Sequence, residues 1–443
     1  MGEAFPEVAE KETHIELVIG TEETSFNKTL DRGLIHFDRL VSGLGEKEIP
    51  GPDAFRLYDT YGFPLDLTQL MAREKGLSVD EKGFSEAMAA QKQRARRSGS
   101  FRRDDSDLDW SSVSEGEDSM FLGYETLDVR ALVRRYAPSN GQTMVILDQT
   151  PFYAESGGQV GDTGRIEGTG VDLDVIDVQK DGDSFVHICT GTLDPDALGS
   201  GEVKCVVDGV RRAHTRRNHT ATHLLHAAVK QVLGDQVQQA GSFVDPDHLR
   251  FDLTYFEKIT PEKVTEIENI VNREILLNNK LNVSVKAFDE AKAEGVVAMF
   301  GEKYGDQVRV VEAGDISKEL CGGTHVDRTG DIGLFKVTEE SSLASGVRRL
   351  VAVTGDRAVE LVQEQAEILG SLRSLLNCGP DQLSERVESI LSDRKDLSKR
   401  LKKRHEAEGP DVNDWLKSAD QVDDHLFVIE LVEEGDTEDL KRI

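Results

Sequence analysis

The spacing of apolar residues changes its period near residue 124. Up to about residue 98 the apolar side chains recur at three- to four-residue intervals, as over 15–40, which is typical of amphipathic helices. Gly43 follows that run and predicts the end of a helix. Lysine and arginine crowd residues 92–103, and acids, serine and glycine come after them, which indicates a linker. We expect a helical region over 1–123 with this linker at its end.

From residue 124 the apolar period falls to two, the period of a half-buried β-strand. Short alternating runs separated by glycine and aspartate predict four strands, at 143–147, 171–178, 184–189 and 203–207. Several short strands at this spacing are typical of a small barrel. The sequence therefore predicts a small β-barrel over 124–208.

Helical and strand patterns alternate over residues 209–355, which predicts an α+β domain. The expected helices are 218–233, 261–276 and 288–295, and the expected strands are 249–253, 281–287, 307–312, 333–338 and 347–354.

The last part of the chain is predicted to be a helical linker over 356–408. Its apolar residues keep a heptad rhythm for under three heptads, which is weak evidence for a coiled coil. An apolar run at 426–432 predicts a strand, and the chain stops soon after a helix start at 436–439. We expect 409–443 to be the truncated start of a C-terminal globular domain. The predicted fold class is thus α+β multidomain.

Composition narrows the possible classes of protein. Of the 443 residues, 38% are hydrophobic and 31% are charged, as in a soluble globular chain. No run approaches the roughly 18 apolar residues of a membrane span, so we expect no membrane contact. Four scattered cysteines fit a reducing cytoplasm rather than a disulfide scaffold, and we expect a cytoplasmic protein.

Charge argues in two directions. With 53 basic against 83 acidic residues, the net charge of −30 disfavours a polyanionic partner overall. Four arginines within seven residues, Arg211, Arg212, Arg216 and Arg217, are a local exception. They can either meet phosphates or pair with nearby acids in a solvated turn.

Histidine and cysteine spacing gives the sharpest chemical signal. His219 and His223 are four apart on a predicted helix, so both imidazoles share one face, as two ligands of one metal require. Thr220 stands where a zinc protease needs glutamate, which disfavours protease chemistry. Cys321 and His325 flank a Gly-Gly turn and complete a Cys/His₃ set suited to Zn²⁺.

Blander interpretations of these residues remain open. The histidines can be surface residues of a helix, and Cys321 can be a buried apolar cysteine. His226, at i+7 from His219, can be a substitute ligand or can support one. The glycine-rich segment 151–164 lacks the Lys-Ser/Thr ending of a phosphate loop, so it is either a hairpin or a lining of a site.

Taken together, five segments closely resemble the alanyl-tRNA synthetase family in its bacterial form. They are FRLYDTYGFPLDL at 55–67, TPFYAESGGQ at 150–159, HTATH at 219–223, CGGTH at 321–325 and SGVRRLVAVTG at 345–355. The resemblance covers the end of the tRNA-recognition region, the editing domain and the linker towards the C-terminal domain. It implies that ATP and Mg²⁺ belong only to an aminoacylation domain, to which nothing in this sequence is similar.

The resemblance also implies roles for single residues. His219, His223, Cys321 and His325 match the family's zinc ligands, with one Zn²⁺ per chain. Thr222 and Gln239 match positions of the editing pocket. Asp59, with Tyr58, matches the segment that faces the acceptor stem of tRNA, and the arginines at 211, 212, 216 and 217 are expected to join it in binding.

The expected partner is therefore tRNA(Ala), and the expected activity is hydrolysis of Ser-tRNA(Ala) and Gly-tRNA(Ala). The family's C-terminal region makes a homo-oligomer possible. Two alternatives stand beside this hypothesis. One is a free-standing trans-editing deacylase, which the helical segment at 54–67 disfavours; the other is a non-catalytic tRNA-binding scaffold stapled by its metal.

Overall fold

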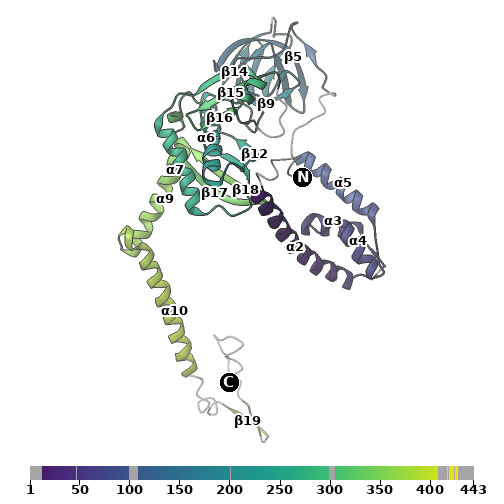
Figure 1. Cartoon of the computed structure of the whole chain (residues 1–443), viewed down its shortest axis with the longest axis vertical. Helices are drawn as coiled ribbons and strands as arrows, with labels where there is room; N and C mark the ends of the chain where they lie inside the picture. The colour runs from purple at the N-terminus through teal and green to yellow at the C-terminus, as the bar shows by residue number, and fades with distance from the viewer. Residues whose placement is uncertain are drawn as a thin grey trace. The chain divides into compact units, whose positions relative to one another are not determined.

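The structure is a computed structural model that describes residues 12–45, 47–98, 108–199, 201–298, 305–407, 417, 419–423 and 425–427. The chain divides into two compact units, Met1–Val359 and Glu360–Ile443 (Figure 1). Its class is mixed α+β and multidomain, as predicted.

The N-terminal region of the first unit is helical. Its helices are α2 (Glu12–Ser42), α3 (Gly51–Tyr61), α4 (Leu65–Glu74) and α5 (Glu81–Ser98), with a short parallel pair β1 (Glu48–Ile49) and β2 (Ser78–Val79). Helix α2 ends directly before Gly43, where the sequence predicted its end. Phe37 and Phe63 lie at the centre of a small core. Most of the basic stretch 92–103 lies outside the residues or side chains that are described.

A closed antiparallel barrel follows. Its strands are β5 (Asp128–Ser139), β6 (Gln142–Leu147), β8 (Gly164–Gly168), β9 (Val171–Asp181), β10 (Ser184–Leu193) and β11 (Glu202–Val207). They are hydrogen-bonded in the order β11-β8-β9-β10-β6-β5, and β11 pairs with β5 to close the ring. The four predicted strands are present, and β5 and β8 are additional. Strand β5 escaped prediction because paired arginines and a bulge near Val133 interrupt its alternation.

The short strands around the barrel matter for the site. β3 (Ser111–Ser112) pairs with β5, and β4 (Met120–Phe121) pairs in parallel with β7 (Gln149–Thr150). Because β7 leads directly into the glycine-rich segment 151–164, these strands hold that segment against the rest of the unit.

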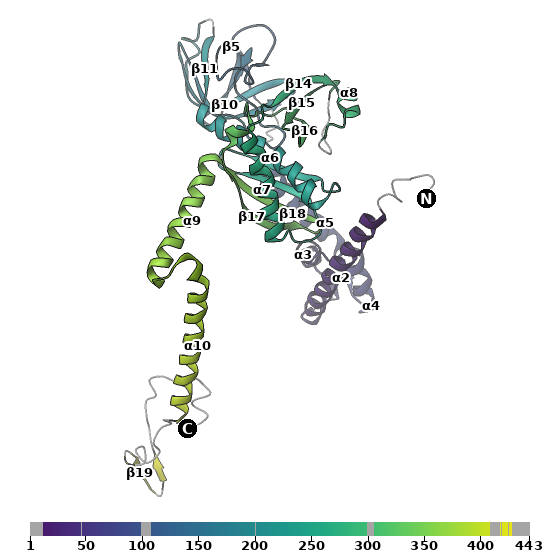
Figure 2. The same ribbon diagram turned by 60° about the vertical axis from the view of Figure 1, so that its left-hand side comes forward.

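The next part of the unit is built around the buried helix α6 (Gly209–Leu233). One sheet has the order β12-β13-β18-β17 and a second has the order β14-β15-β16 (Figure 2). The elements are β12 (Gln239–Val244), β13 (Leu249–Thr254), α7 (Pro261–Leu277), β14 (Asn282–Ala287), α8 (Phe288–Ala293), β15 (Gln307–Ala313), β16 (Ser317–Leu320), β17 (Phe335–Ala344) and β18 (Val347–Thr354). Leu224, Leu225, Phe251 and Phe335 fill the core between them.

Helix α6 begins nine residues before its predicted start at 218. Asp208 caps its first turn, since its carboxylate accepts from the backbone N–H of Val210 and Arg211 at 3.1 and 3.0 Å. The predicted start of the helix at 218, which left the arginines in front of it, is therefore wrong, and the alternative of a solvated turn falls with it. The arginines form the first half of the helix itself.

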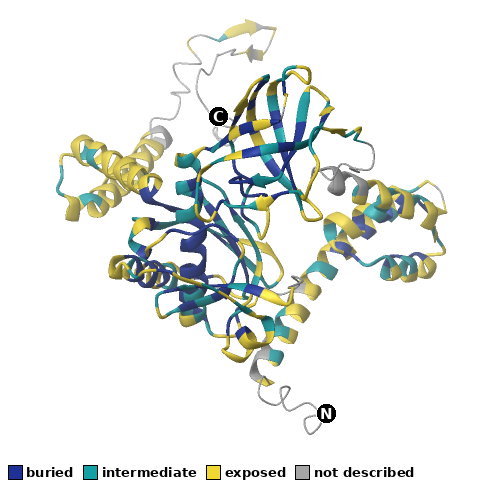
Figure 3. Ribbon diagram, turned by 90° about the horizontal axis from the view of Figure 1, so that it is seen from above, coloured by how far each residue is buried: buried dark blue, intermediate teal, exposed yellow. Residues whose placement is uncertain are grey.

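The second unit continues the helical part of the chain. The residues for which a helical linker is predicted form two helices, α9 (Gly355–Leu376) and α10 (Leu383–Ala407), separated by a turn at 377–382. Their surfaces are mostly exposed, in contrast to the strands of the barrel and helix α6 (Figure 3).

Two short strands, β19 (Asp420–Val422) and β20 (His425–Phe427), form a hairpin further along this unit. β20 is the described beginning of the strand predicted at 426–432, and the helix start expected at 436–439 lies outside the described residues. None of the helices that the structure describes has the length and apolarity to cross a bilayer.

Candidate metal centre

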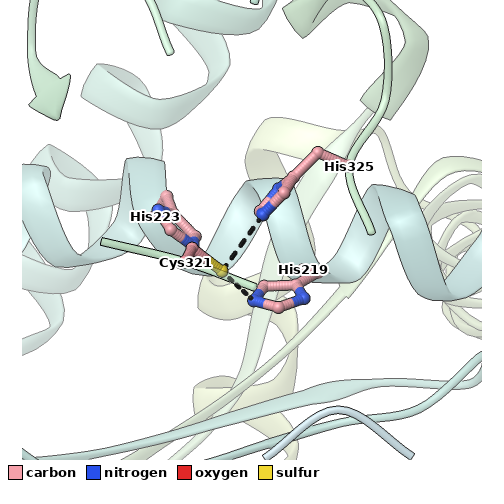
Figure 4. A group of neighbouring side chains, drawn as sticks. All are labelled: His219, His223, Cys321 and His325. Carbon is pink, nitrogen blue, oxygen red and sulfur yellow. Dashed lines mark hydrogen bonds between the residues drawn. The ribbon is translucent and has the colours of Figure 1, made fainter. Parts of the chain in front are cut away.

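Four side chains from two distant segments meet in the first unit. Helix α6 supplies His219 and His223, and the loop after β16 supplies Cys321 and His325 (Figure 4). Their donor atoms all lie within 4.8 Å of one another. The three imidazole rings are 4.5 to 5.3 Å apart between centroids, so the space that they enclose is about the size of one ion. The predicted ligand set is brought together as the spacing required.

The Gly-Gly turn of the loop is a steric requirement. A Cβ atom on Gly323 would lie 2.0 Å from Cε1 of His219, so any larger residue would push the helix and the loop apart. Gly322 is exposed, and no heavy atom lies within 4 Å of the position that its Cβ would take. The turn thus packs tightly against α6 on one side and opens towards solvent on the other.

Gln159 fixes the orientation of His219. It is fully buried, its Oε1 accepts from the backbone N–H of Thr324 at 2.9 Å, and its Nε2 donates to the Thr324 hydroxyl at 3.0 Å. Nδ1 of His219 lies 2.7 Å from the same Oε1. An amide oxygen only accepts, so Nδ1 carries the proton. The lone pair of Nε2 then faces Sγ of Cys321, 3.4 Å away.

Thr220 performs the same task for His325. Its hydroxyl donates to the carbonyl of Arg216 at 2.9 Å and accepts from the backbone N–H of Val326 at 3.2 Å. Nδ1 of His325 lies 3.1 Å from that hydroxyl oxygen, which leaves Nε2 free to face Sγ of Cys321 at 3.3 Å. Such partners orient metal-binding histidines in many proteins.

Glu319 lies behind the third histidine. Its buried carboxylate places Oε2 3.1 Å from Nδ1 of His223, in an ion-pair approach rather than a well-aligned hydrogen bond. Oε1 lies 3.0 Å from Nδ1 of His226. His226 therefore shares the carboxylate behind the ligands, and the alternative that it replaces a ligand is not supported.

Electrostatics favour a cation among these groups. Burial alone would raise the pKa of the Cys321 thiol, but His219, His325 and His223 hold it well below its usual range. Burial lowers the pKa of His325 to about 3, so its imidazole is neutral. Burial also acts to lower the pKa of His223, but Glu319 and the Cys321 thiolate raise it to about 9. A thiolate and neutral imidazoles are the forms that bind Zn²⁺, which would displace the proton from His223.

The four arginines of α6 are in different surroundings. Arg212 is only 2% exposed. Its Nε donates to Asp162 at 2.9 Å, and its Nη1 and Nη2 donate to the carbonyls of Gly123 and Pro151 at 2.7 and 2.8 Å. We therefore withdraw Arg212 from the predicted tRNA contact: it joins α6 to the barrel.

The other three arginines are partly exposed. Arg216 donates to the carbonyl of His325 and, at 2.8 Å, to Asp327. It therefore also supports the loop 321–325 after β16, which we call the metal loop. Arg217 pairs with the exposed Asp356 at 3.2 Å. Nε of Arg211 is buried without a hydrogen-bond partner among the described residues.

The remaining predicted residues lie on three elements. Thr222 is buried on α6 between the two histidine ligands, and its hydroxyl donates to the carbonyl of Asn218 at 2.8 Å. Gln239 is the half-buried first residue of β12. Asp59 is exposed on α3, in the helical region, and does not belong to the metal cluster.

Sequence reasoning missed two of the supporting residues, Thr220 and Glu319. A signal existed for Glu319, because the period of two along β16 places it on the same face as Cys321. Thr220 carried no such signal, since its bond to His325 depends on tertiary structure.

Comparisons with known proteins agree on one family. The family model described as tRNA synthetases class II (A) matches residues 1–211, and the model of the threonyl and alanyl tRNA synthetase second additional domain matches 308–351. The chain is 46% identical over 413 residues to the alanine–tRNA ligase of Halorhodospira halophila, covering 91% of this chain and 47% of that protein.

Two further relatives have the same name. The alanine–tRNA ligase of Pseudoalteromonas translucida is 43% identical over 428 residues, covering 95% of this chain and 48% of that protein. That of Saccharophagus degradans is 42% identical over 455 aligned residues, covering 100% and 51%. The chain thus spans about half the length of the curated relatives that it matches.

Proposed function

Because this chain belongs to the alanine–tRNA ligase family, we propose that it carries a zinc-containing editing site that hydrolyses Ser-tRNA(Ala) and Gly-tRNA(Ala). The observation that carries this proposal is the convergence of the buried His219, His223 and His325 with the partly buried Cys321. Gln159 and Thr220 fix the orientations of His219 and His325, and Glu319 lies in ion-pair distance of His223, which is the support that metal-binding histidines commonly have.

The chemistry of alanine explains why such a site is useful. A pocket shaped for alanine cannot exclude the smaller glycine, and an added hydroxyl is rejected weakly in an apolar pocket. A second site that hydrogen-bonds the hydroxyl of serine can remove the error after it is made. The correct product, alanyl-tRNA(Ala), lacks that hydroxyl, so this contact separates the seryl ester from the correct product.

Residues of this chain can supply the selectivity. The Thr222 hydroxyl proton is committed to the carbonyl of Asn218, so its oxygen remains an acceptor. The hydroxyl of a serine ester can donate to it. Gln239 is the second candidate for this contact, in keeping with its resemblance to a pocket position.

Zn²⁺ fits the donor set, and four protein ligands close such a site. When bound, it would supply positive charge that orients the ester and the terminal ribose. The supporting residues keep the imidazole lone pairs pointed inwards, and the attacking water comes from outside the ligand set. This proposal implies an enzyme that works in the cytoplasm and acts on tRNA(Ala).

Contact with tRNA falls to exposed basic groups. Arg217 can exchange its exposed carboxylate partner for a phosphate, and Arg211 lies earlier on the same helix. Arg216 is already engaged with the metal loop and would act mainly through it. Asp59 would contribute to recognition of the acceptor stem from the helical region.

One observation favours a second candidate. Because four protein ligands leave no open position on the metal, the cluster can equally staple a non-catalytic tRNA-binding scaffold. The structural role and the editing role predict the same zinc content but different activity.

Hydrolysis of aminoacyl esters separates the two. We expect the purified chain to deacylate Ser-tRNA(Ala) and Gly-tRNA(Ala) well above the spontaneous rate and to leave Ala-tRNA(Ala) nearly intact. A preparation that holds one zinc per chain and binds tRNA(Ala), yet hydrolyses none of the three esters, would establish the scaffold instead.

A further inference from the structure

Tyr124 stands at the open side of the metal loop. It follows strand β4 (Met120–Phe121), is 46% exposed, and donates a hydrogen bond from its hydroxyl to the carbonyl of Gly322. Gly322 is the exposed residue of the Gly-Gly turn, directly after Cys321, with open space where a side chain would be. A tyrosine is thus hydrogen-bonded to the exposed turn of the loop that carries Cys321 and His325.

Arg309, on β15, lies against this ring. Its guanidinium carbon is 4.2 Å from the ring centroid, and its Nη1 donates to the carbonyls of Cys321 and Gly323 at 2.8 and 2.9 Å. The same guanidinium therefore orders both the metal loop and the tyrosine ring.

Two further contacts, made by other neighbours, restrain the ring of Tyr124. Phe121 meets it edge-on with centroids 4.8 Å apart. The preceding residue, Gly123, has its carbonyl held by the buried Arg212 at 2.7 Å. A half-exposed tyrosine restrained by its hydroxyl, by a cation and by a second ring has lost most of its freedom before any ligand arrives.

On the basis of the proposed function, we propose that Tyr124, backed by Arg309, is a stacking platform for the 3′-terminal nucleobase of the aminoacyl-tRNA. Proteins hold unpaired bases by stacking them on aromatic rings, often with an arginine contribution. In an aminoacyl-tRNA the ester is carried by the ribose of that last nucleotide. A base stacked on Tyr124 therefore keeps the ester, which is part of the same nucleotide, close to the cluster of Cys321 and the three histidines.

A purely structural role would give Tyr124 different requirements. If the residue only clips the Gly-Gly turn, its hydroxyl matters and its ring does not. If it is a platform, loss of the ring costs far more than loss of the hydroxyl, which only helps to restrain the ring. Tyr124→Phe and Tyr124→Leu separate these requirements.

Tyr255 is a suitable control position. It is a partly buried tyrosine that also has a cation over its ring, Lys263 at 5.5 Å, but it lies on the loop after β13. Tyr255→Leu tests whether loss of any tyrosine–cation pair gives the same effect.

The first measurement is binding of an acceptor-stem RNA hairpin whose 3′-terminal adenine is replaced by 2-aminopurine. Stacking of 2-aminopurine on a tyrosine quenches the fluorescence of the 2-aminopurine. The measurement does not depend on hydrolysis of an ester. We expect the wild type, Tyr124→Phe and Tyr255→Leu to quench it, and Tyr124→Leu to lose the quench and to bind the hairpin about 10-fold more weakly. An equal quench with Tyr124→Leu would overturn the platform.

The second measurement is the kinetics of Ser-tRNA(Ala) hydrolysis, with bound zinc determined for each variant. We expect Tyr124→Leu to raise KM about 10-fold with little change in kcat, at full zinc content. Equal losses in Tyr124→Phe and Tyr124→Leu, in zinc or in KM, would show a clip and overturn the proposal. If the wild type hydrolyses no ester, the editing function fails while the fluorescence result still decides on the platform.

Discussion

The side-chain oxygen of Gln159 lies 2.7 Å from Nδ1 of His219, although the two residues are 60 positions apart. Gln159 belongs to the segment beside the barrel, and His219 belongs to helix α6, which carries two of the candidate metal ligands. The barrel segment therefore sets the tautomer of a candidate ligand that another part of the unit supplies. The same amide also holds the backbone of Thr324 in the metal loop at 2.9 Å.

This relationship predicts that Gln159→Leu weakens zinc binding although it removes no ligand. Without the acceptor, the imidazole of His219 loses its fixed orientation, and loss of such partners costs about 10- to 100-fold in metal affinity. Competition with a fluorescent zinc chelator measures the change. Gln179→Leu is the control, because it removes an amide side chain from barrel strand β9. Equal zinc affinities in the wild type, Gln159→Leu and Gln179→Leu would show that the Gln159 contact is dispensable.

A second prediction concerns acid. His187 is buried in the barrel with Nε2 2.7 Å from the hydroxyl of Thr150 and Nδ1 2.9 Å from the carbonyl of Val145. Burial lowers its pKa to about 4, against the opposing effect of the Val145 hydrogen bond. Between about pH 6.5 and 4 the unfolded chain then binds the additional proton, so stability falls as pH falls, by up to about 1.4 kcal/mol per pH unit.

Thermal unfolding at pH 7, 6 and 5 tests this contribution. His187→Gln, which lacks the titrating group, should be less stable than the wild type at pH 7 and should lose less stability on acidification. Parallel pH profiles for the two proteins would show that His187 is not the source of acid sensitivity.

A third prediction separates the arginines of α6. Replacing Arg211 and Arg217 with glutamine should weaken tRNA(Ala) binding and reduce the slope of log K against log salt by about one for each phosphate that is no longer neutralised. Arg212→Gln should instead destabilise the fold, because it leaves the buried Asp162 without its oppositely charged partner. Binding isotherms at several salt concentrations give the slope, and an unchanged slope would show that Arg211 and Arg217 neutralise no phosphate.

A fourth prediction tests how serine is distinguished. Thr222→Val keeps the shape of the side chain and removes its oxygen, so hydrolysis of Ser-tRNA(Ala) should slow by about 10-fold or more. Gly-tRNA(Ala) should be affected less, because glycine has no hydroxyl to lose a partner. If single-turnover rates for both esters fall equally, Thr222 positions the ester or the water, and the selectivity must reside elsewhere, with Gln239 the next candidate.

The sequence indicated the candidate metal cluster because the spacing of its residues is local: four residues along a helix, and four across a Gly-Gly turn. It could not indicate Thr220 or the burial of Arg212, because these depend on contacts across 105 and 50 residues. The early start of α6 was visible in principle, since Asp208 is a good cap, but the arginine-rich segment after it has few apolar residues to show a helical period. The barrel strands with clean alternation were predicted, whereas β5, with its outward arginines and its bulge, was not.

The proposed editing chemistry requires a link between the metal cluster and ester hydrolysis. That link can be tested by titrating zinc into metal-stripped protein while the rate of Ser-tRNA(Ala) hydrolysis is followed. Cys321→Ala removes one ligand, and Cys378→Ala is a matched control, because Cys378 is a free cysteine of the second unit outside the cluster.

We expect the hydrolysis rate to rise in proportion to zinc and to level off at about one equivalent per chain, in the wild type and in Cys378→Ala alike. Cys321→Ala should bind zinc far more weakly and remain inactive over the same range. A hydrolysis rate that is already maximal in the metal-stripped protein, or that is unchanged in Cys321→Ala, would contradict the assignment of this cluster as the editing centre.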